Sequence, residues 1–473
     1  MYSHMAQCLL YFLMIMRIII IYLYFYTTQF IDKGRLIDLN EKRQLCIGLA
    51  LSSTWLKGNG WRRPDSGIED LYSSDYYVEL AKLAEKAKLD FVFRPDAMYL
   101  NMDALSHSPG FGSLDPTILL ASIARETKYI GLVTTASTTF NPPYVVARQL
   151  QSLHWVSNGR AGWNMVTALD GLDNFGASQM PSSEERYAQA REFCDVVHKL
   201  WDSYPNEALL MDRESGKMVD QEKISPIDHA GEYFRVKGPL NLPAHSAGSI
   251  PLFQAGASNT GRDFAASTAD AIFAASPDIA SGTELRSDLR RRAQEHGRHP
   301  DAVRVLPGLY FFLASTRDEA RELHREAHAH LSTDRRYQAV QSILGLDIRH
   351  LPMDQRVTAD VLPDADQPVR SRTHADLLRR LIVEQQPTVE ELLARPEVVG
   401  SAHWVIVGTV EDALKDILAW HEAGAMDGFI ALPGGSRQSM QLFFDELMPL
   451  LVERGLFRSE YTGSILSEHL GIQ

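Results

Sequence analysis

Residues 157–167 read Ser-Asn-Gly-Arg-Ala-Gly-Trp-Asn-Met-Val-Thr, and this stretch is the most informative in the chain. A strand that only fills a core uses branched aliphatic residues, whereas glycine inside a strand marks a bend or a close approach of another group. We therefore predict a core strand at residues 161–166 whose C-terminal end is shaped for function. A plain tight turn before a strand is the alternative interpretation.

Short apolar runs alternate with longer segments of helical periodicity from Gln44 onward. Short apolar strands that are each followed by a helix indicate a parallel sheet covered on both faces. Eight such units favour an α/β fold of the (β/α)₈ TIM-barrel type over an open doubly wound sheet. The predicted strands are residues 45–51, 91–94, 130–136, 161–166, 251–254, 271–274, 303–313 and 429–432, and the predicted helices are 75–88, 116–127, 142–156, 184–201, 260–268, 284–295, 317–331, 409–422 and 438–451.

Several predicted helices begin with recognisable capping residues. Asp115 and Asn141 each precede a proline, which is the order expected of a capping side chain and a first-turn proline. Ser182 or Ser183 precedes two glutamates, and Thr409 precedes Glu411 and Asp412. These signals place the starts of four helices.

Two long segments do not fit a minimal barrel. Residues 202–248 separate the fourth helix from the fifth strand and include a short predicted strand within 231–238. Residues 338–400 are polar and contain five prolines. Long insertions of this kind are usually lids or oligomer contacts. We predict one barrel domain at 41–473 with insertions near 202–248 and 338–400, preceded by an apolar extension at 1–40.

Composition limits the class of protein. The chain has 473 residues, a net charge of −13 and no basic stripe, so nucleic acid is not an expected partner. Its three cysteines fit neither a disulfide framework nor a zinc site and indicate a reducing compartment such as the cytoplasm.

The N-terminus differs from the remainder of the chain. Residues 9–26 are apolar or aromatic except for Arg17, which is long enough for a marginal membrane span or signal-anchor. Arg17 near the centre would be costly in hydrocarbon. We favour an upstream extension of the gene, with the native start further along, over a membrane segment.

Function in such a barrel sits at the C-terminal ends of the strands. The residues that follow the predicted strands there are small, polar and hydrogen-bonding, which suits a large planar ligand with a polar tail. Residues 254–262, Gln-Ala-Gly-Ala-Ser-Asn-Thr-Gly-Arg, are the sharpest candidate for a phosphate site, because a small-residue turn enters a helix. Ser258 supplies a hydroxyl and Arg262 a charge, although ordinary helix capping by Ser258 or Asn259 explains the pattern equally well. Gly434-Gly435-Ser436 is a weaker second phosphate loop.

Other signatures are missing or weak. No G-x-G-x-x-G follows a strand, and no P-loop or G-x-S-x-G elbow occurs. His324 and His328 share a helix face with His330 nearby, but ligand-spaced carboxylates or cysteines do not accompany them. We therefore predict no metal site.

The motifs resemble, in order, those of the nitrilotriacetate monooxygenase family of bacterial-luciferase-like flavin monooxygenases. The resemblance covers about residues 43–472. The matching segments are 61–64 (WRRP), 137–144 (STTFNPPY), 157–167, 185–187 (ERY), 200–203 (LWDS), 238–241 (GPLN), 254–262 and 454–461 (RGLFRSEY).

The resemblance implies a barrel that binds FMN as FMNH2, delivered by a separate NAD(P)H-dependent flavin reductase. Dioxygen then adds to the flavin, and the resulting hydroperoxide oxidises a small organic substrate. The protein chiefly positions the cofactor and excludes water. A homo-oligomer in the cytoplasm is implied as well.

The resemblance also assigns cofactor-binding residues. Asp96 ends the second strand near the flavin, Ser137 and Thr138 meet the isoalloxazine, and Asn164 lies on the rim. At the phosphate end it implies Tyr187 together with Ser258 and the amides of Ala257 and Asn259.

Some residues depart from the family pattern. Ser183 stands where relatives often have histidine, which implies one cationic donor fewer for the phosphate. Arg94 and Pro95 precede Asp96 where smaller or apolar residues are usual, so the pocket is expected to differ and the substrate does not transfer from any relative.

Two other functions compete with the monooxygenase. One is a same-fold flavin or deazaflavin oxidoreductase that transfers hydride without oxygen insertion. The other is a non-enzymatic, membrane-anchored flavin-binding protein, suggested by residues 9–26.

Overall fold

The computed structural model describes residues 44–51, 60–102, 105, 112–176, 179–329, 331–365, 367, 369, 371–399 and 402–472. The chain divides into two units, Met1–Arg43 and Gln44–Gln473, and every described residue lies in the second. The apolar stretch at 9–26 lies outside the described residues. Within the described part of the chain, no helix is both long and apolar enough to cross a membrane.

Eight parallel strands close into a barrel, which confirms the predicted fold class. Neighbours pair in the order β1-β2-β3-β4-β9-β10-β11-β13, and β13 returns to β1 with Cys46 opposite Gly428. The strands lie where the sequence predicts them, within a few residues at each end. They are β1 (Cys46–Ala50), β2 (Phe91–Arg94), β3 (Gly131–Ser137), β4 (Ala161–Val166), β9 (Leu252–Ala255), β10 (Ala271–Ala274), β11 (Arg304–Leu313) and β13 (Gly428–Pro433).

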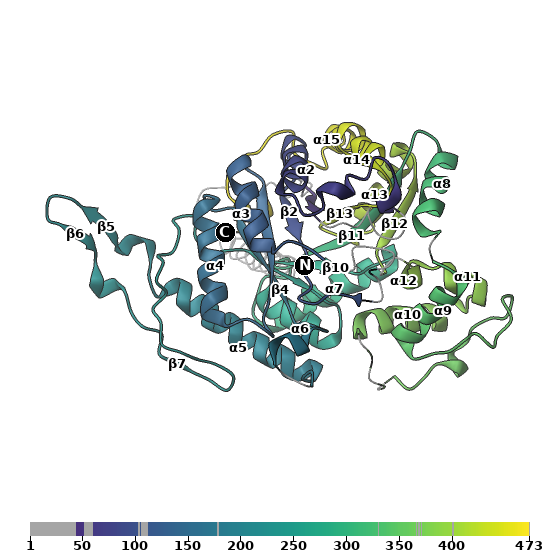
Figure 1. Cartoon of the computed structure of the whole chain (residues 1–473), viewed down its shortest axis with the longest axis horizontal. Helices are drawn as coiled ribbons and strands as arrows, with labels where there is room; N and C mark the ends of the chain where they lie inside the picture. Colours follow the sequence, from purple (N-terminus) through teal and green to yellow (C-terminus); the bar gives the residue numbers. More distant parts are fainter. Residues whose placement is uncertain are drawn as a thin grey trace, which may run out of the picture. The chain divides into compact units, whose positions relative to one another are not determined.

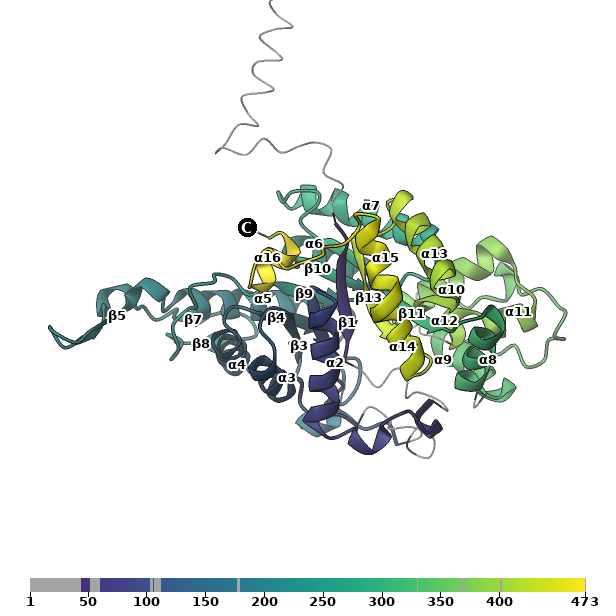
Figure 2. The same cartoon turned by 90° about the horizontal axis from the view of Figure 1, so that it is seen from above.

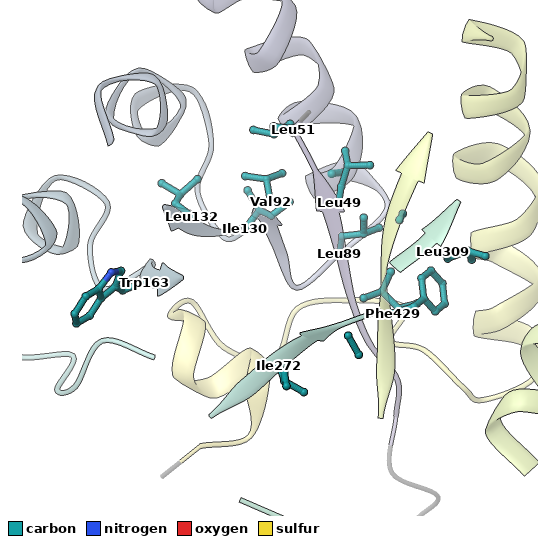
Figure 3. Close-up of a cluster of buried hydrophobic side chains, with 14 of the residues drawn as sticks. Leu49, Leu51, Leu89, Val92, Ile130, Leu132, Trp163, Ile272, Leu309 and Phe429 are labelled. Atoms are coloured by element: carbon teal, nitrogen blue, oxygen red, sulfur yellow. The ribbon is translucent and has the colours of Figure 1, made fainter. Parts of the chain in front are cut away.

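Side chains alternate between the inside of the barrel and the helices around it. Val92, Leu132 and Trp163 point outward into one large apolar cluster beneath the helices (Figure 3). Phe91, Phe93, Val133 and Phe253 belong to a second cluster that fills the barrel interior. Both faces of each strand are therefore buried, which explains the almost uniformly apolar strand sequences.

Helices follow the strands as the periodicity indicates. The α-helices that cover the barrel are α2 (Ser74–Lys86), α3 (Pro116–Glu126), α4 (Pro143–Val156), α5 (Ser183–Asp202), α6 (Asn259–Thr268), α7 (Ile279–Glu295), α13 (Val410–Glu422), α14 (Arg437–Leu442) and α15 (Met448–Glu453), with a π-helical turn at Phe443–Leu447 between the last two. Helix α8 (Arg317–His328) packs on β11 and β12. Short 3₁₀ turns lie at Gly60–Arg62, Ile68–Asp70, Leu172–Phe175, Asn206–Ala208, Gln221–Lys223 and Ala359–Val361.

Three of the four predicted helix starts are confirmed. Asp115 accepts a hydrogen bond from the Ile118 amide, and Ser182 and Thr409 each form a capping box. The assignment of Asn141 as a cap is wrong. Helix α4 begins one residue later, after Pro142, and Asn141 Nδ2 donates to the Ser137 carbonyl at 2.9 Å.

The first insertion contains two hairpins, β5 (Leu209–Asp212) with β6 (Lys217–Val219) and β7 (His229–Ala230) with β8 (Arg235–Val236). The short strand predicted within 231–238 is therefore the second arm of a two-stranded ribbon. Figure 1 shows β5 and β6 extending away from the barrel, beyond α4 and α5.

The second insertion was predicted only as a polar segment. In the structure it forms four helices around a hydrophobic core of its own. They are α9 (Thr333–Leu344), α10 (Arg372–Gln385), α11 (Val389–Ala394) and α12 (Pro396–Val399), and Figure 1 shows them grouped together. Leu378, Ile382 and Leu392 are fully buried among them. Charged residues between these apolar positions hide the periodicity, since only one face of each helix packs inward.

A ninth strand, β12 (Trp404–Gly408), was missed by the sequence analysis. It pairs with the second half of β11, from Leu309 to Leu313, and so extends the wall at the C-terminal mouth of the barrel. The segment has only five residues and ends in glycine, so its sequence pattern is too short to indicate a strand.

The glycines of residues 157–167 make room for a plug at the N-terminal end of the barrel. A Cβ on Gly162 would lie 2.7 Å from Leu466 Cδ2, and one on Gly159, whose φ is +86°, would lie 2.7 Å from Ile465 Cγ2. Leu466 belongs to α16 (Leu466–Leu470), the short yellow helix beside the strands in Figure 2. The close approach inferred from glycine is therefore an approach of the C-terminal helix.

Arg160 and Trp163 have structural roles. The buried Arg160 guanidinium donates to the carbonyls of Ala124, Thr127, Ile130 and Ser157 and to the Thr127 hydroxyl, at 2.7–3.1 Å. Trp163 Nε1 donates to the Ala136 carbonyl at 3.1 Å. Arg160 thereby ties the end of α3 to the start of β4.

Acid should destabilise the fold through His154 on α4. The ring is 1% exposed, and burial, followed by the nearby His245, lowers the pKa of His154 from 6.5 to about 4. The folded state therefore disfavours the proton that the unfolded state accepts. The free energy of unfolding is therefore unaffected by the titration of His154 above pH 6.5. It falls as the pH drops from 6.5 toward 4, by about 3 kcal/mol in total. Urea unfolding at a series of pH values measures this slope.

The matched variant is His154→Leu, which fills a similar volume without a titrating group. We expect its unfolding free energy to fall less steeply between pH 6.5 and 4 than that of the parent protein. Equal slopes in the two proteins would remove His154 as the source of the acid sensitivity.

Candidate cofactor site at the barrel mouth

The strand ends at the C-terminal mouth carry the polar groups that the sequence singled out. Asn164 follows Gly162 on the inward face of β4, and its Nδ2 donates to Thr135 Oγ1 at 3.0 Å. Thr135 Oγ1 in turn donates to the Arg94 carbonyl at 2.7 Å. Asn164 is 2% exposed, yet its Oδ1 accepts no hydrogen bond from any described residue. An unsatisfied buried acceptor is costly, so this oxygen is a candidate acceptor for a ligand donor.

Ser137 lies two residues beyond Thr135 and shares its inward face. Its Oγ accepts a hydrogen bond from the Thr139 amide at 3.1 Å, which leaves the hydroxyl hydrogen free for another acceptor. Thr138 is not brought to this surface. It is 1% exposed, and both its amide and its hydroxyl donate to the Val166 carbonyl, so it joins β3 to β4.

Asp96 follows the end of β2 by two residues and is half-buried. Burial raises the pKa of the Asp96 carboxyl, and hydrogen bonds from the Ala97 amide and the Ser113 hydroxyl oppose that rise. The preceding Arg94 side chain points away from the barrel, over the Tyr77 ring at 4.9 Å. Arg94 therefore does not reshape the inside of the mouth as its departure from the family pattern suggested.

The phosphate candidate is assembled from α5, β9 and the start of α6. Gln254 Nε2 donates to the Tyr187 hydroxyl on α5 at 3.4 Å, and the side chains of Thr167 and Ser258 lie close enough to lower the pKa of that hydroxyl. Burial raises the pKa of the Tyr187 hydroxyl, so it remains protonated and can donate. Ser183, the first residue of α5, stands one helical turn before Tyr187. Helix geometry thus puts Ser183 on the same face.

Two glycines leave space around the Tyr187 hydroxyl. A Cβ on Gly261 would lie 2.7 Å from this oxygen, and one on Gly256, whose φ is +139°, would lie 3.1 Å from it. Ser258 is the N-cap of α6, and its Oγ accepts from the Gly261 amide at 3.2 Å. The amides of Asn259 and Thr260 in the first turn have no intrahelical acceptor. The result is a small cradle of donors at a helix N-terminus, which fits a phosphate group.

Two further expectations about charge and phosphate are not met. Arg262 Nε donates to the Ala257 carbonyl at 2.9 Å, and its guanidinium pairs with Glu284 at 2.6 Å and Asp288 at 3.1 Å, so its charge is already neutralised. Gly434 and Gly435 are explained by packing, because added Cβ atoms would lie 2.4 Å from Tyr310 and from Leu323. The weaker phosphate loop is therefore a tightly packed turn.

The paired histidines pack against aromatic residues. The rings of His324 and His328 lie 4.4 Å apart and contact Phe312, while His330 lies outside the described residues. Burial lowers the pKa of His324 to about 4. No group of three or more potential metal ligands occurs in the part of the chain that the structure describes.

Comparison with known proteins identifies the family. The family model described as luciferase-like monooxygenase matches residues 61–427. N-acetyl-S-(2-succino)cysteine monooxygenase of Bacillus subtilis (strain 168) is 35% identical, with 92% of this chain and 98% of the relative covered. Nitrilotriacetate monooxygenase component A of Aminobacter aminovorans has the same identity and coverage.

A solved structure leads to the same family. Riboflavin lyase, solved with modified FMN and riboflavin, is 29% identical, with a TM-score of 0.78 over 91% of this chain and 96% of that one. The family model and the two curated relatives span most of the barrel and both of its insertions. The chain belongs to the luciferase-like monooxygenase family.

Proposed function

We propose that this chain is the oxygenase component of a two-component, FMN-dependent monooxygenase that oxidises a small organic substrate with dioxygen. The observation that carries the proposal is the pairing of the donor cradle at Tyr187 and Ser258 with the unsatisfied Asn164 oxygen at the same mouth. One suits a phosphate, and the other suits an N–H group of a flavin ring. Together they suit the two ends of one planar, phosphorylated cofactor.

At the phosphate end, Tyr187 and Ser258 would supply hydroxyl groups, and the amide of Asn259 would add a backbone donor. The Ala257 amide, which the resemblance also assigns to the phosphate, already donates to Thr373 Oγ1 at 2.9 Å. Ser183 would add a hydroxyl where the family more often has histidine. These neutral donors act with the dipole of α6, which favours an anion at its N-terminus. FMN, which carries the phosphate, is therefore proposed over riboflavin.

At the ring end, Asn164 would accept from the flavin and Ser137 would donate to it. Asp96, whose carboxyl favours protonation more than a free aspartate does, would lie beside the ring and could hold a proton there. Thr138 would act only indirectly, by holding β3 against β4. The bound cofactor would supply the activation of dioxygen, and the chain would orient the substrate and exclude water.

The reductase partner is proposed from the relatives. The name of the Aminobacter protein identifies it as one component of its enzyme. We infer that a separate NAD(P)H-dependent reductase delivers FMNH2 to this chain as well, and that the enzyme acts in the cytoplasm.

We also propose a homo-oligomer. Support comes from α3 and α4, where Ile118, Val145 and Val156 are 74%, 43% and 54% exposed along one groove. Contiguous apolar surface of this kind marks contact sites. Sedimentation of the purified protein should show an assembly larger than one chain, and a monomer at micromolar concentration would contradict it.

The proposed activity is tested by supplying reduced FMN with and without dioxygen. We expect substrate-dependent product only when oxygen is present, screened by oxygen uptake coupled to product analysis. Turnover under anaerobic conditions would instead favour the hydride-transferring alternative. The full-length relatives named as monooxygenases support the first outcome.

The membrane-anchored alternative rests on residues outside the described structure. Mass spectrometry of the native N-terminus addresses it together with the proposed domain division at residue 40. A chain that starts beyond about residue 30 would eliminate the anchor.

A further inference from the structure

The phosphate candidate is touched by a residue from the second insertion. The Ala257 amide, which the resemblance assigns to the phosphate, instead donates its hydrogen to Thr373 Oγ1 at 2.9 Å. Thr373 is the second residue of α10 and lies 116 positions further along the chain. The four-helix insertion thus reaches the proposed phosphate site through the Thr373 hydroxyl.

Two helix N-termini meet at this contact. Helix α6 begins beside Ala257, and α10 begins beside Thr373. The N-cap of α10, Ser371, makes no capping hydrogen bond, and its Oγ is instead 2.8 Å from His374 Nδ1. The first amides of α10 are therefore uncapped, and both helix dipoles present their positive ends to the same place.

A cavity of about 650 Å³ opens between these two helix starts and α7. Ala257, Asn259 and Thr373 line it, and so does Ser276, which follows β10. Ser276 is 1% exposed, and its hydroxyl has no hydrogen-bond partner among the described residues. A buried hydroxyl without a partner is an observation independent of the helix ends that points to a missing ligand.

The charges around the cavity are balanced. Arg262, Arg292 and Arg380 line the wall together with Glu284, Asp376 and Glu384. Arg262 is held by Glu284, and Arg380 lies 3.3 Å from Glu384, so these cations are not free to capture an anion. Recognition must then come from directed neutral donors such as the hydroxyls and the uncapped amides.

We propose that Thr373 and Ser276 are phosphate-positioning residues, so that the second insertion completes the FMN site; this rests on the proposed function. Thr373 accepts the Ala257 hydrogen bond with a lone pair, which leaves its hydroxyl hydrogen for a phosphate oxygen. Ser276, whose hydroxyl lines the same cavity, would supply a second donor. The insertion therefore contributes to choosing FMN over riboflavin, the same ring system without the phosphate.

The test compares FMN with riboflavin, both reduced anaerobically, by titration of tryptophan fluorescence in the full chain. Thr373→Val, which keeps the shape and removes the hydroxyl, should weaken FMN binding about tenfold and leave riboflavin binding unchanged. Thr373→Ser should retain the affinity of the parent protein. Ser276→Ala should weaken FMN binding by a smaller factor, which gives a second readout if the valine variant folds poorly.

The results distinguish a failure of the Thr373 role from a failure of the FMN assignment. FMN binding that stays equal or becomes tighter in Thr373→Val would overturn the role of Thr373, provided that the parent protein still prefers FMN over riboflavin. A parent protein that binds the two flavins equally would contradict the FMN assignment itself, and the inference with it.

Discussion

Ser258→Asp should weaken FMN binding by about a hundredfold, because it places a carboxylate beside the proposed phosphate. Two like charges about 4 Å apart near a protein surface repel by several kcal/mol, and about 2.7 kcal/mol corresponds to a hundredfold change in affinity. Aspartate is as good an N-cap as serine, so α6 should keep its start. Calorimetric titration with FMN, beside a thermal melt of each protein, measures the two effects separately.

Ser258→Asn is the matched control, because asparagine caps helices equally well and carries no charge. We expect it to bind FMN far more tightly than the aspartate variant. If the two variants bind FMN alike, Ser258 is an ordinary cap and the phosphate lies elsewhere.

Arg160→Met should lower the free energy of unfolding by at least about 3 kcal/mol. The guanidinium makes five hydrogen bonds to buried acceptors, four of them carbonyls. Methionine fills much of the space but leaves these acceptors unsatisfied, and each unsatisfied buried group costs about 1–3 kcal/mol. Urea unfolding at pH 7.5 measures the loss.

Arg160→Lys is the informative comparison, because it keeps the charge but has a single nitrogen in place of the planar fork. We expect it to be destabilised as well, by less than the methionine variant. A methionine variant as stable as the parent protein would show that the link between α3 and β4 contributes little.

The barrel was predictable because its strands are local, short and apolar on both faces. The predicted strand at 161–166 coincides with β4, and Gly159 and Gly162 indicated a close approach there. The partner in that approach, Leu466, was not predictable, since it comes from the far end of the chain. Periodicity describes an element and does not say what packs against it.

The helices of the second insertion were harder to predict, because their stability also depends on what packs against them. In α10 the apolar residues occupy one face, and arginines at 372, 379 and 380 interrupt the pattern. Helices of this kind are stabilised by mutual packing, so local sequence carries a weak signal. The five-residue strand β12 is likewise stabilised by its pairing with β11, so its own sequence gives a weak signal.

At the proposed site, the sequence could suggest residues near strand ends but not residues brought in by long-range contacts. Asn164, Ser137, Tyr187 and Ser258 were named from strand ends and motifs. Thr135 carried the same strand-end signal, two residues before Ser137 on the same face. Thr373 carried none, because only folding brings the insertion to Ala257.

The central claim is that one atom of dioxygen enters the product while the chain holds reduced FMN. The most direct measurement is turnover under oxygen-18 gas in ordinary water, with FMNH2 supplied by a flavin reductase and the product analysed by mass spectrometry. The account predicts one labelled oxygen atom in each product molecule. Unlabelled product, formed equally well without oxygen, would contradict it.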